Sequence, residues 1–540
     1  MAFGIDLGTT NSCVAHIDDA GRAAIIKSAL SEDMTPSAVY FESPRHAIVG
    51  RTARNAAIIA PELVAQQVKR DMGKGVEYTF HGKPHTPEMV SAVILKELAR
   101  GVEENTGQVV RDVVITVPAN FGVAEREATR RAGQFAELNV LDLLAEPVAA
   151  ALHYQAVTGT CSGMRHILVY DLGGGTFDTT VIRVDGDDIA VVCTDGDARL
   201  GGADWDAIIV DNFLGQFADK HPGLRPREDA SFMQDLTISV ERLKEDLSSV
   251  QSRRHVMRFG GAVCHIDFSR DELEKLTEGL LNKTVAVTER TIAAARDQGV
   301  THFDDVLLVG GMTRMPAVAR VLKDRLGLTA RLHQPDFAVA KGAALFALTR
   351  TIRSAGGASS GLRSAEDVAA STGLTVPEVE EIARKRVTTV VSRGFGVMSL
   401  DGRDPRALTD PVRARKMIVH LLSANTPLPE DTGPFTFHTA SDNQRLVAIE
   451  VWEQAGEVES EELADNRKIG QGMLKIPARL PAQTPLEVTF YMSETGRLTV
   501  RAIEPDSGMN LRFDLQIGDL DKAGMDQARR SVADYDVSGD

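Results

Sequence analysis

Two segments far apart in the chain follow the same pattern, and this near-repeat limits the possible fold more than any other feature. The first reads FGIDLGTTNSCV at residues 3–14, and the second reads VYDLGGGTFDTTV at residues 169–181. Each has an apolar strand, an aspartate, a turn of glycine and threonine, and a second strand. Such hairpin tips present backbone N–H groups and hydroxyls to phosphate oxygens, because glycine permits close approach and left-handed dihedral angles.

Both hairpins carry an aspartate at the end of their first strand. Asp6 and Asp171 are therefore candidates to hold a hydrated Mg²⁺ that neutralises the same phosphates. The sequence has no G-x-x-x-x-G-K-[ST] motif, which excludes the P-loop class. One glycine-rich turn alone is more often a simple connection between strands, whereas two copies in the same register favour a phosphate site.

A third element, VLLVGGMTRMPA at residues 306–317, runs from an apolar strand through two glycines into a helix with Pro316 in its first turn. This arrangement lets a nucleotide lie against bare backbone at a helix N-terminus. Alone it is weak support, since many α/β proteins contain such turns. Together with the two hairpins it predicts a two-lobed nucleotide cleft.

The pattern of apolar residues divides the chain of 540 residues into four parts. Alternating strand and helix patterns predict an α/β domain over residues 1–350. Residues 351–391 hold a Gly/Ser-rich connector and two short helices around Gly373, residues 392–518 alternate as antiparallel strands of a sandwich, and residues 519–540 form a short acidic tail that we expect to fray.

Composition excludes several classes of protein. Hydrophobic residues make up 43% and charged residues 25% of the chain, as in soluble globular proteins. A formal charge of -16 disfavours nucleic acid and anionic membranes as partners. Four scattered cysteines fit a reducing compartment, and a strand beginning at Phe3 leaves no room for a signal peptide, so we expect a cytoplasmic protein.

Six motifs stand in a characteristic order: GIDLGTTNSCVA, VPANF, EPVAAALHY, DLGGGTFDTTVI, LLVGGMTRMP and QPDFAVAKGAA. With them the chain resembles the actin-like ATPase superfamily, and most closely the seventy-kilodalton heat-shock (DnaK-like) chaperones. The resemblance covers about residues 1–350 and, more weakly, residues 390–517. It implies a two-lobed actin-like ATPase domain with a duplicated ribonuclease-H-like core, followed by an antiparallel β-sandwich.

By this resemblance the chain is an ATP-dependent chaperone that hydrolyses ATP to ADP and phosphate, with Mg²⁺ and K⁺ organised by its aspartates. The residues implied for catalysis are Lys69, Asp6, Asp171, Thr176, Asp178 and Glu146, of which the three aspartates also serve the metal. Those implied for the phosphates and the nucleoside are Gly8, Thr9, Thr10, Gly173, Gly174, Gly175, Glu241, Lys244, Ser248, Gly310, Gly311, Arg314 and Asp336. Without the resemblance, Lys69 would be read as a solvated helical cation, and Glu241 with Lys244 as an ordinary surface pair.

The resemblance also implies a peptide cleft in the β-sandwich. Its lining residues are Val397, Leu400, Ala440, Val447 and Ile449. Alternate residues of a strand share a face, so these positions can instead belong to the sandwich core. The implied partners are unfolded client polypeptides, a J-domain co-chaperone and a nucleotide-exchange factor, with no membrane and no nucleic acid.

The chain departs from the family at the junction between its domains. The family's leucine-rich linker is replaced by KRVTT at residues 385–389, so docking through buried apolar side chains loses most of its driving force. On the facing side, Asn120, Gly122 and Val123 replace the usual tyrosine, asparagine and aspartate. We therefore expect weak coupling between the domains, or coupling through different contacts.

Two further departures bear on function. The family's helical lid does not fit into the residues from Asp519 onward, so we expect fast peptide exchange. Residues 365–386 resemble a helix-turn-helix, but the glutamates of the second helix disfavour DNA and favour a spacer or a docking element. An interaction protein in which ATP acts as a switch for dedicated partners remains an alternative, and a small-molecule kinase is a third.

Overall fold

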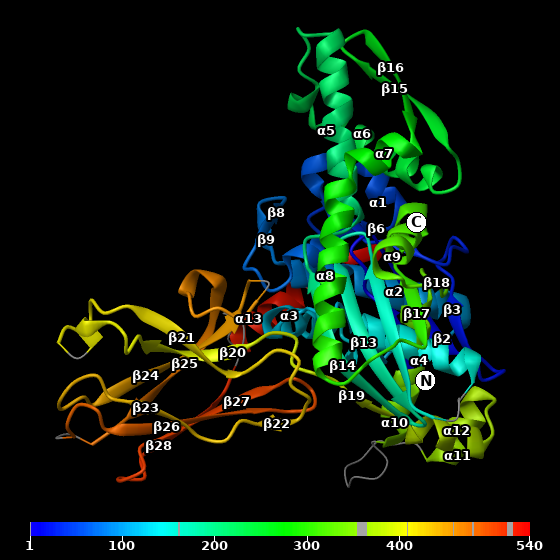
Figure 1. Cartoon of the computed structure of the whole chain (residues 1–540). Helices are drawn as coiled ribbons and strands as arrows, with labels where there is room; N and C mark the ends of the chain where they lie inside the picture. The colour runs from blue at the N-terminus through cyan, green and yellow to red at the C-terminus, as the bar shows by residue number, and fades with distance from the viewer. Residues whose placement is uncertain are drawn as a thin grey trace.

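The computed structural model describes residues 2–159, 163–353, 364–407, 409–456, 458–477, 480–515 and 522–539. A large α/β domain, residues 2–353, contains most of the helices, and a β domain, residues 395–514, extends from its side (Figure 1). The α/β domain has two halves, which we call lobe I and lobe II. Each half is built around one of the two repeated hairpins.

Lobe I contains a mixed sheet with the strand order β11-β10-β1-β2-β3, in which β4 also pairs with β2. The first repeated segment forms the antiparallel hairpin β1–β2, and β10 runs parallel to β1. Helices α2 and α3 share a buried core with this sheet. The elements are β1 (Ala2–Asp6), β2 (Asn11–Ile17), β3 (Ala23–Ile26), β4 (Thr35–Pro36), β10 (Asp112–Val117), β11 (Asn139–Ala145), α2 (Pro87–Thr106) and α3 (Val123–Phe135).

Lobe II repeats this plan in a sheet of order β18-β17-β12-β13-β14-β19. The second repeated segment forms the antiparallel hairpin β12–β13, and β17 runs parallel to β12 as β10 does to β1. The duplicated sheets therefore follow from the duplicated sequence. The elements are β12 (Arg165–Leu172), β13 (Phe177–Asp185), β14 (Asp188–Asp197), β17 (Asp305–Val309), β18 (Arg331–Leu332), β19 (Arg386–Thr388), α8 (Glu278–Asp297) and α9 (Pro316–Leu326).

Helices α4 (Glu146–Thr158) and α10 (Ala338–Arg353) join the lobes. Both are rich in alanine, so their backbones approach closely and share one core with strands of both sheets. A β-carbon at Gly342 would lie 1.8 Å from the carbonyl oxygen of Ala149, so this crossing requires glycine.

Each lobe carries a smaller unit above its sheet. On lobe I, β5 (Ala38–Ser43), β6 (His46–Val49) and β7 (Val64–Gln66) form a sheet near α1 (Arg51–Ala56) and the hairpin β8 (Tyr78–Phe80) and β9 (Lys83–His85). On lobe II, α5 (Gly202–Lys220), α6 (Ala230–Leu247) and α7 (Arg270–Leu276) accompany the hairpin β15 (Ser252–Phe259) and β16 (Ala262–Ser269). This second unit reaches the top of the molecule in Figure 1.

After the α/β domain the chain forms a pair of short helices, α11 (Ala365–Thr372) and α12 (Val376–Arg384). Capping boxes start both helices, and Gly373 ends α11 in the left-handed conformation. Val368 and Val379 are buried against Cys13 and Leu348 of lobe I. The pair is therefore seated on its own α/β domain.

The linker docks on lobe II through its backbone, although the sequence predicted that docking through buried apolar side chains would lose most of its driving force. Residues 386–388 form β19, which pairs in parallel with β14 at the edge of the lobe II sheet, with Val387 opposite Ile189. The N–H of Arg386 donates to the carbonyl of Asp187 at 2.8 Å. Strand addition uses backbone hydrogen bonds, which do not require leucine side chains, so the docking seen here is a contact of a different kind from the burial of an apolar linker.

Two antiparallel sheets make up the β domain, with the orders β21-β20-β24-β25 and β22-β26-β27-β28, and β23 pairs with β26. Apolar residues of both sheets meet in one core that includes Phe395, Val451, Phe490 and Val500. The strands are β20 (Phe395–Leu400), β21 (Lys416–Leu422), β22 (Glu430–Asp431), β23 (Phe435–His438), β24 (Leu446–Gln454), β25 (Asn466–Lys475), β26 (Pro485–Met492), β27 (Leu498–Ile503) and β28 (Asn510–Asp514).

The last described segment forms α13 (Lys522–Ala533) and β29 (Asp536–Ser538), and both lie on lobe I. The expectation that residues 519–540 fray was wrong for this described part. Although this segment is acidic overall, it contains four apolar residues that are buried in the lobe I core: Ala528, Val532, Tyr535 and Val537. Among the residues that the structure describes, no helix combines the length and apolar character needed to cross a membrane.

Candidate nucleotide cleft and domain interface

A cleft of about 900 Å³ lies between the two lobes of the α/β domain. Its size is in the range that proteins use to bind small molecules and cofactors. Both repeated hairpins and the Gly-Gly element reach it, as the sequence predicted. The sequence-predicted residues that line it are Asp6, Gly8, Thr9, Thr10, Lys69, Glu146, Asp171, Gly173, Gly174, Gly175, Thr176, Glu241, Lys244, Ser248, Gly310, Gly311, Arg314 and Asp336.

The tips of the two hairpins touch one another inside this cleft. A β-carbon at Gly174 would lie 2.1 Å from Thr10 Oγ1, and one at Gly175 would lie 2.5 Å from Thr9 Oγ1. Only glycine allows two loops to meet this closely. The hydroxyls and backbone N–H groups of both tips are thus concentrated where phosphate oxygens would bind.

Four carboxyl groups lie close enough to the cleft centre to influence one another electrostatically: Asp6, Asp171, Asp178 and Glu146. Asp6 accepts a hydrogen bond from Thr116 Oγ1 at 3.0 Å, and Asp178 accepts one from the backbone N–H of Asn120 at 3.0 Å. Asp178 is 1% exposed and does not line the cleft itself. It therefore lies behind the cleft surface, against the backbone of residue 120.

Burial and mutual repulsion raise the pKa values of these carboxyl groups. Burial raises the pKa of Asp6 to about 6, and burial with the Glu146 charge raises the pKa of Asp178 to about 8. The same two causes raise the pKa of Asp171 well above its ordinary value. The centre of the cleft therefore has an excess of negative charge that a bound cation would relieve.

Lys69 is the cation that the structure places in this group. It lies in a 3₁₀ turn, residues Val68–Asp71, and its Nζ is 2.5 Å from Glu146 Oε1. Burial alone would lower the pKa of Lys69, but the carboxylates of Glu146 and Asp6 outweigh it and raise the pKa above its ordinary value. Lys69 is buried and stays charged, so it is not a solvated surface lysine.

The predicted nucleoside contacts lie at the other end of the cleft, where several are engaged with protein groups. Lys244 Nζ is 2.8 Å from Asp206 Oδ1 and donates to the carbonyl of Gly202 at 3.0 Å. Arg314 forms an ion pair with Asp336 beside Gly311. Met312, which stands where the family usually has a hydroxyl residue, is 8% exposed in the lobe II core.

Three contacts across the cleft were not predicted from the sequence. Arg54 of α1 forms an ion pair with Glu241 of α6, and this pair bridges lobe I and lobe II. Arg70, next to Lys69, donates to the carbonyl of Gly175 at 3.0 Å and lies 2.5 Å from Asp204. No sequence motif pointed to these roles of Arg54 and Arg70, because the partners of each arginine lie more than a hundred residues away in the chain.

These residues fit a magnesium-bound nucleotide. The carboxylate-rich centre supplies oxygen ligands and negative charge, and the glycine tips supply backbone donors. Among the described residues, no three histidine, cysteine, aspartate or glutamate side chains are close enough to hold a bare metal ion. The aspartates supply carboxylate oxygens, which are the kind of ligand that a hydrated Mg²⁺ takes.

A second charged cluster lies where the β domain meets lobe I. Glu453 of β24 is fully buried, accepts the backbone N–H of Val123 at 2.9 Å, and lies 2.7 Å from Arg467. Glu125 of α3 lies 3.1 Å from Arg467 and 3.5 Å from Arg393. Burial would raise the pKa of Glu125, but the two guanidinium groups outweigh it and lower the pKa below its ordinary value.

Asn120 connects this interface to the cleft. Its N–H donates to Asp178 at 3.0 Å, and its carbonyl accepts from Arg393 Nε at 3.1 Å. The next carbonyl, that of Phe121, accepts from Ser392 Oγ at 3.0 Å. A single peptide segment of lobe I therefore touches a cleft aspartate on one side and the start of the β domain on the other.

The predicted peptide-lining residues do not share one environment. Val397 and Ile449 are 3% and 6% exposed and belong to the core between the two sheets, so in this structure they do not line an open groove. The cause is strand alternation, which puts them on the same inward face as Val451. Val447 packs partly against this core, while Leu400 and Ala440 are half-buried.

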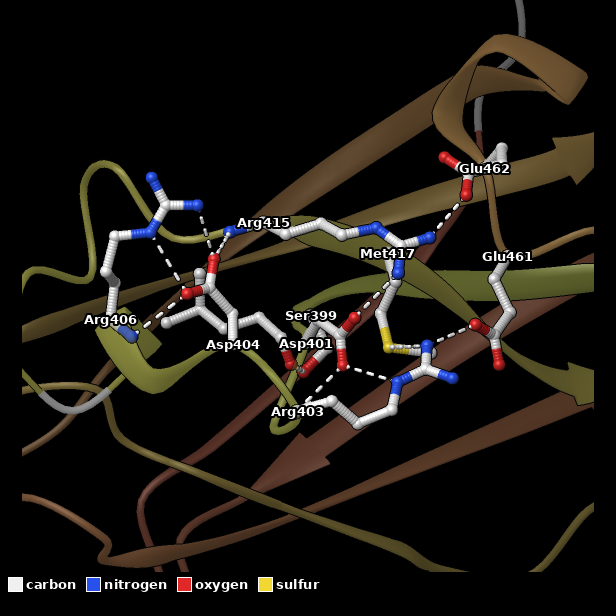
Figure 2. A network of polar contacts seen from close by, with 10 residues as sticks. Ser399, Asp401, Arg403, Asp404, Arg406, Arg415, Met417, Glu461 and Glu462 are labelled. Atoms are coloured by element: carbon white, nitrogen blue, oxygen red, sulfur yellow. Dashed lines mark hydrogen bonds and ion pairs between the residues drawn. The ribbon is translucent and has the colours of Figure 1, made fainter.

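A network of arginine and carboxylate groups follows Leu400 directly (Figure 2). The buried Asp401 accepts hydrogen bonds from Arg403 Nε at 2.8 Å and from Arg415 at 2.8 Å. Arg403 also reaches Glu461 at 2.5 Å, and Arg415 pairs with Glu462. The loop between β20 and β21 is thereby tied to the segment that precedes β25.

The duplicated sheets, the paired hairpin tips and the acidic centre together define a two-lobed nucleotide-binding protein. Comparison with known families agrees, since the family model described as Hsp70 protein matches residues 2–78 and 74–353. The chain belongs to the Hsp70 family, and through it to the actin-like ATPase superfamily. Members of this family are chaperones and ATPases that in general bind ATP or ADP with Mg²⁺.

Proposed function

We propose that this chain is an ATP-dependent chaperone of the Hsp70 type that hydrolyses ATP to ADP and phosphate and binds extended apolar segments of unfolded proteins through a sandwich-type β domain. The observation that carries the proposal is the contact of the two hairpin tips beside a buried Lys69–Glu146 pair. Membership of the Hsp70 family over residues 2–353 supports it.

The roles of the cleft residues follow from their chemistry. Backbone donors and hydroxyls at Thr9, Thr10 and Gly173 to Thr176 bind phosphate oxygens. Lys69 stabilises the negative charge that develops there, and Glu146 holds its ammonium in position. Asp6 and Asp171 would hold a hydrated Mg²⁺, which when bound would neutralise phosphate charge, and Asp178 would add negative charge from behind the cleft surface.

Coupling between nucleotide and β domain is proposed to run through Asn120. Asp178 accepts the N–H of Asn120 and Arg393 donates to the carbonyl of the same residue, so a change in the charge of Asp178 shifts the acceptor that Arg393 uses. These contacts replace the apolar linker contacts of other family members. Coupling therefore goes through different contacts, which is one of the two alternatives that the sequence left open.

The β domain is proposed to bind client segments without cover from the helix that follows it in the described chain. The helix that follows β28 in the described chain, α13, packs on α2 and α3 of the α/β domain (Figure 1). Client segments would then exchange quickly, because a lid mainly slows release. J-domain co-chaperones and nucleotide-exchange factors, which generally serve this family, are proposed as partners.

The test is the dissociation rate of a fluorescent apolar peptide from the full-length protein in ADP and in ATP, together with ATP turnover. Faster peptide release in ATP supports an ATP-coupled chaperone. Equal release rates with measurable ATP turnover would contradict the coupling, and absence of ATP turnover would contradict the ATPase.

A second candidate is an interaction protein in which ATP switches binding to a few dedicated partners. The burial of Val397 and Ile449 in the core favours it, because these two positions are closed to a client in the docked arrangement. A peptide library separates the two functions: binding to many leucine-rich and isoleucine-rich peptides supports the chaperone, and no binding supports the dedicated partner.

A further inference from the structure

The segment that we call the tail, residues 522–539, occupies a site on lobe I that is separate from the nucleotide cleft and from the predicted peptide groove. Its helix α13 lies against α2 and α3, and its strand β29 lies on the small sheet of lobe I. Ala528, Val532, Tyr535 and Val537 are each 9% exposed or less. Because four of its apolar residues are buried, the tail is bound at a defined site on lobe I.

Strand addition is the first part of this site. β29 pairs in parallel with β6, with Val537 opposite Ala47 and Ser538 opposite Ile48. The N–H of Asp536 donates to the carbonyl of Arg45 at 2.9 Å. The tail thereby covers an edge strand that would otherwise present unpaired backbone groups.

An aromatic pocket is the second part. The Tyr535 ring packs edge-on against Phe41, with ring centroids 5.4 Å apart, and Phe41 in turn stacks on Phe80. The Tyr535 hydroxyl is 2.8 Å from His85 Nε2. This pocket combines an apolar wall with one polar partner, so it selects tyrosine at this position over an aliphatic residue.

A lysine at the end of the helix is the third part. Lys96 of α2 donates to the carbonyls of Val532 and Tyr535 at 3.1 and 3.0 Å. The last carbonyls of a helix have no partner within the helix and attract a positive charge. Lys96 therefore recognises the point at which α13 ends and the extended strand begins.

The position of the tail in the chain gives this site a consequence for the whole molecule. The β domain is held on lobe II at its start, through β19 on β14, and on lobe I by the tail that follows its last strand. Residues 516–521 join Leu515 to Lys522, and a chain of this length spans at most about 25 Å. While the tail is seated, the β domain cannot move far from the α/β domain.

We propose that residues 522–539 are an intramolecular latch, and that lobe I carries a site for a short helix followed by an extended strand with tyrosine, whose occupant is this chain's own tail. Seating of the tail keeps the β domain against the α/β domain, and release of the tail is required before the domains separate. The contacts of the latch described above use no residue that lines the cleft, so the latch needs no direct contact with the nucleotide.

The experiment is hydrogen–deuterium exchange on the full-length protein and its variant Tyr535→Ala, read at three places. Exchange at residues 43–50 reports whether the tail is bound to β6, which we call the seat. Exchange at residues 386–393 reports domain docking, and exchange in β12 and β13 reports global folding. We expect exchange at the first two places to become faster by on the order of 100-fold, with the third unchanged. Tyr535→Phe, which keeps the ring, is expected to change both by less than about tenfold.

Arg530→Ala is the matched control on the same helix, since Arg530 is exposed and its hydrogen bond stays within α13. It should leave all three readings unchanged. Adding a synthetic peptide of residues 522–540 to Tyr535→Ala should restore protection at both places, whereas the same peptide carrying Tyr535→Ala should not. This rescue separates loss of the latch from a general loss of stability.

Three outcomes would overturn the proposal. Unchanged exchange at residues 43–50 in Tyr535→Ala would mean that the tail is not seated there. Faster exchange at residues 43–50 without any change at 386–393 would mean that the seat does not hold the domains. Protection at residues 43–50 that disappears on dilution of the unaltered protein would place the tail of a second copy in the seat, and so would contradict an intramolecular latch.

Discussion

Two charged clusters lie on opposite sides of Asn120, and they are balanced differently. In the cleft, four carboxyl groups surround Lys69, and burial raises the pKa values of Asp6 and Asp178 to about 6 and about 8. At the domain interface, two carboxylates face two guanidinium groups, and the pKa of Glu125 is lowered. The charges at the interface are thus balanced within the protein, whereas the negative charge of the cleft needs a bound cation to balance it.

This difference explains how the two regions can serve one cycle. A cluster that needs a ligand changes its charge when the ligand arrives or leaves, and a balanced cluster keeps its geometry unless a neighbour moves. Asn120 bonds to Asp178 in the first cluster and to Arg393 in the second. The predictions below remove the charge balance of each cluster in turn.

Removing the cation of the cleft should have the largest effect. Lys69→Ala leaves Glu146 buried without its ammonium and removes the charge expected to stabilise the transferring phosphate. We expect single-turnover ATP hydrolysis to slow by about 10² to 10³-fold, with ATP affinity changed much less. Lys83→Ala, on the exposed hairpin β8–β9, is the control and should hydrolyse ATP normally. An unaltered rate in Lys69→Ala would remove Lys69 from the catalytic residues.

Removing a carboxylate of the interface should have the next largest effect. Glu453→Ala leaves Arg467 with Glu125 alone and deprives the Val123 N–H of its acceptor. The loss of one partner from a buried ion pair costs about 3 kcal/mol. Urea unfolding followed by tryptophan fluorescence checks this, because Trp452 reports the β domain and Trp205 reports lobe II.

The control for Glu453→Ala is Glu450→Ala on the same strand. Glu450 lies 2.7 Å from Lys468, whose side chain is 37% exposed, so the loss should stay below about 1 kcal/mol. Equal losses in the two variants would mean that Glu453 has no special place at the interface.

The sequence determined local features better than distant ones. The hairpins at residues 3–14 and 169–181 were predictable, because aspartate, glycine and threonine stand within one turn of each other. The docking of β19 was not, because its hydrogen bonds come from the backbone and leave no side-chain pattern. The site of Tyr535 was not either, because its partners Phe41 and His85 lie 450 residues or more away in the chain.

Filling the close contact at Gly122 should have the third largest effect on the stability of domain docking. A β-carbon at this position would lie 2.4 Å from Glu453 Oε1, so Gly122→Ala forces the carboxylate away from the Val123 N–H. We expect a loss of about 2 kcal/mol in docking of the β domain. Gly101→Ala in α2 is the control: open space surrounds it, and helix propensity predicts a gain of up to about 1 kcal/mol.

Combining Gly122→Ala with Glu453→Ala tests whether the effect of Gly122→Ala comes from a clash with Glu453. If the clash with Glu453 causes the loss, the double variant should be less destabilised than the sum of the single variants. Additive losses would mean that Gly122 acts through another contact.

The smallest expected effect is a pH dependence that belongs to the cleft. The pKa of Asp178 is about 8 in the folded protein against 3.8 in the unfolded chain, so between these values the folded state holds one more proton. Stability therefore falls as pH rises, by about 1.4 kcal/mol per pH unit for a group of this kind. Glu125 has a lowered pKa, so its stabilising effect is fully present between pH 6 and 8 and is lost only when the pH falls below its unfolded pKa; it therefore adds no pH dependence in this range.

Urea unfolding of the nucleotide-free protein at pH 6 and pH 7, read at Trp205, measures this dependence over one pH unit. The free energy of unfolding should be larger at pH 6, and saturating Mg²⁺ with ATP should reduce the difference, because a bound cation replaces the extra proton. Asp178→Asn should reduce it as well, since the amide does not titrate. If stability rose with pH in the nucleotide-free protein, the cleft would already be charge-balanced without a ligand, and the contrast with the interface would fail.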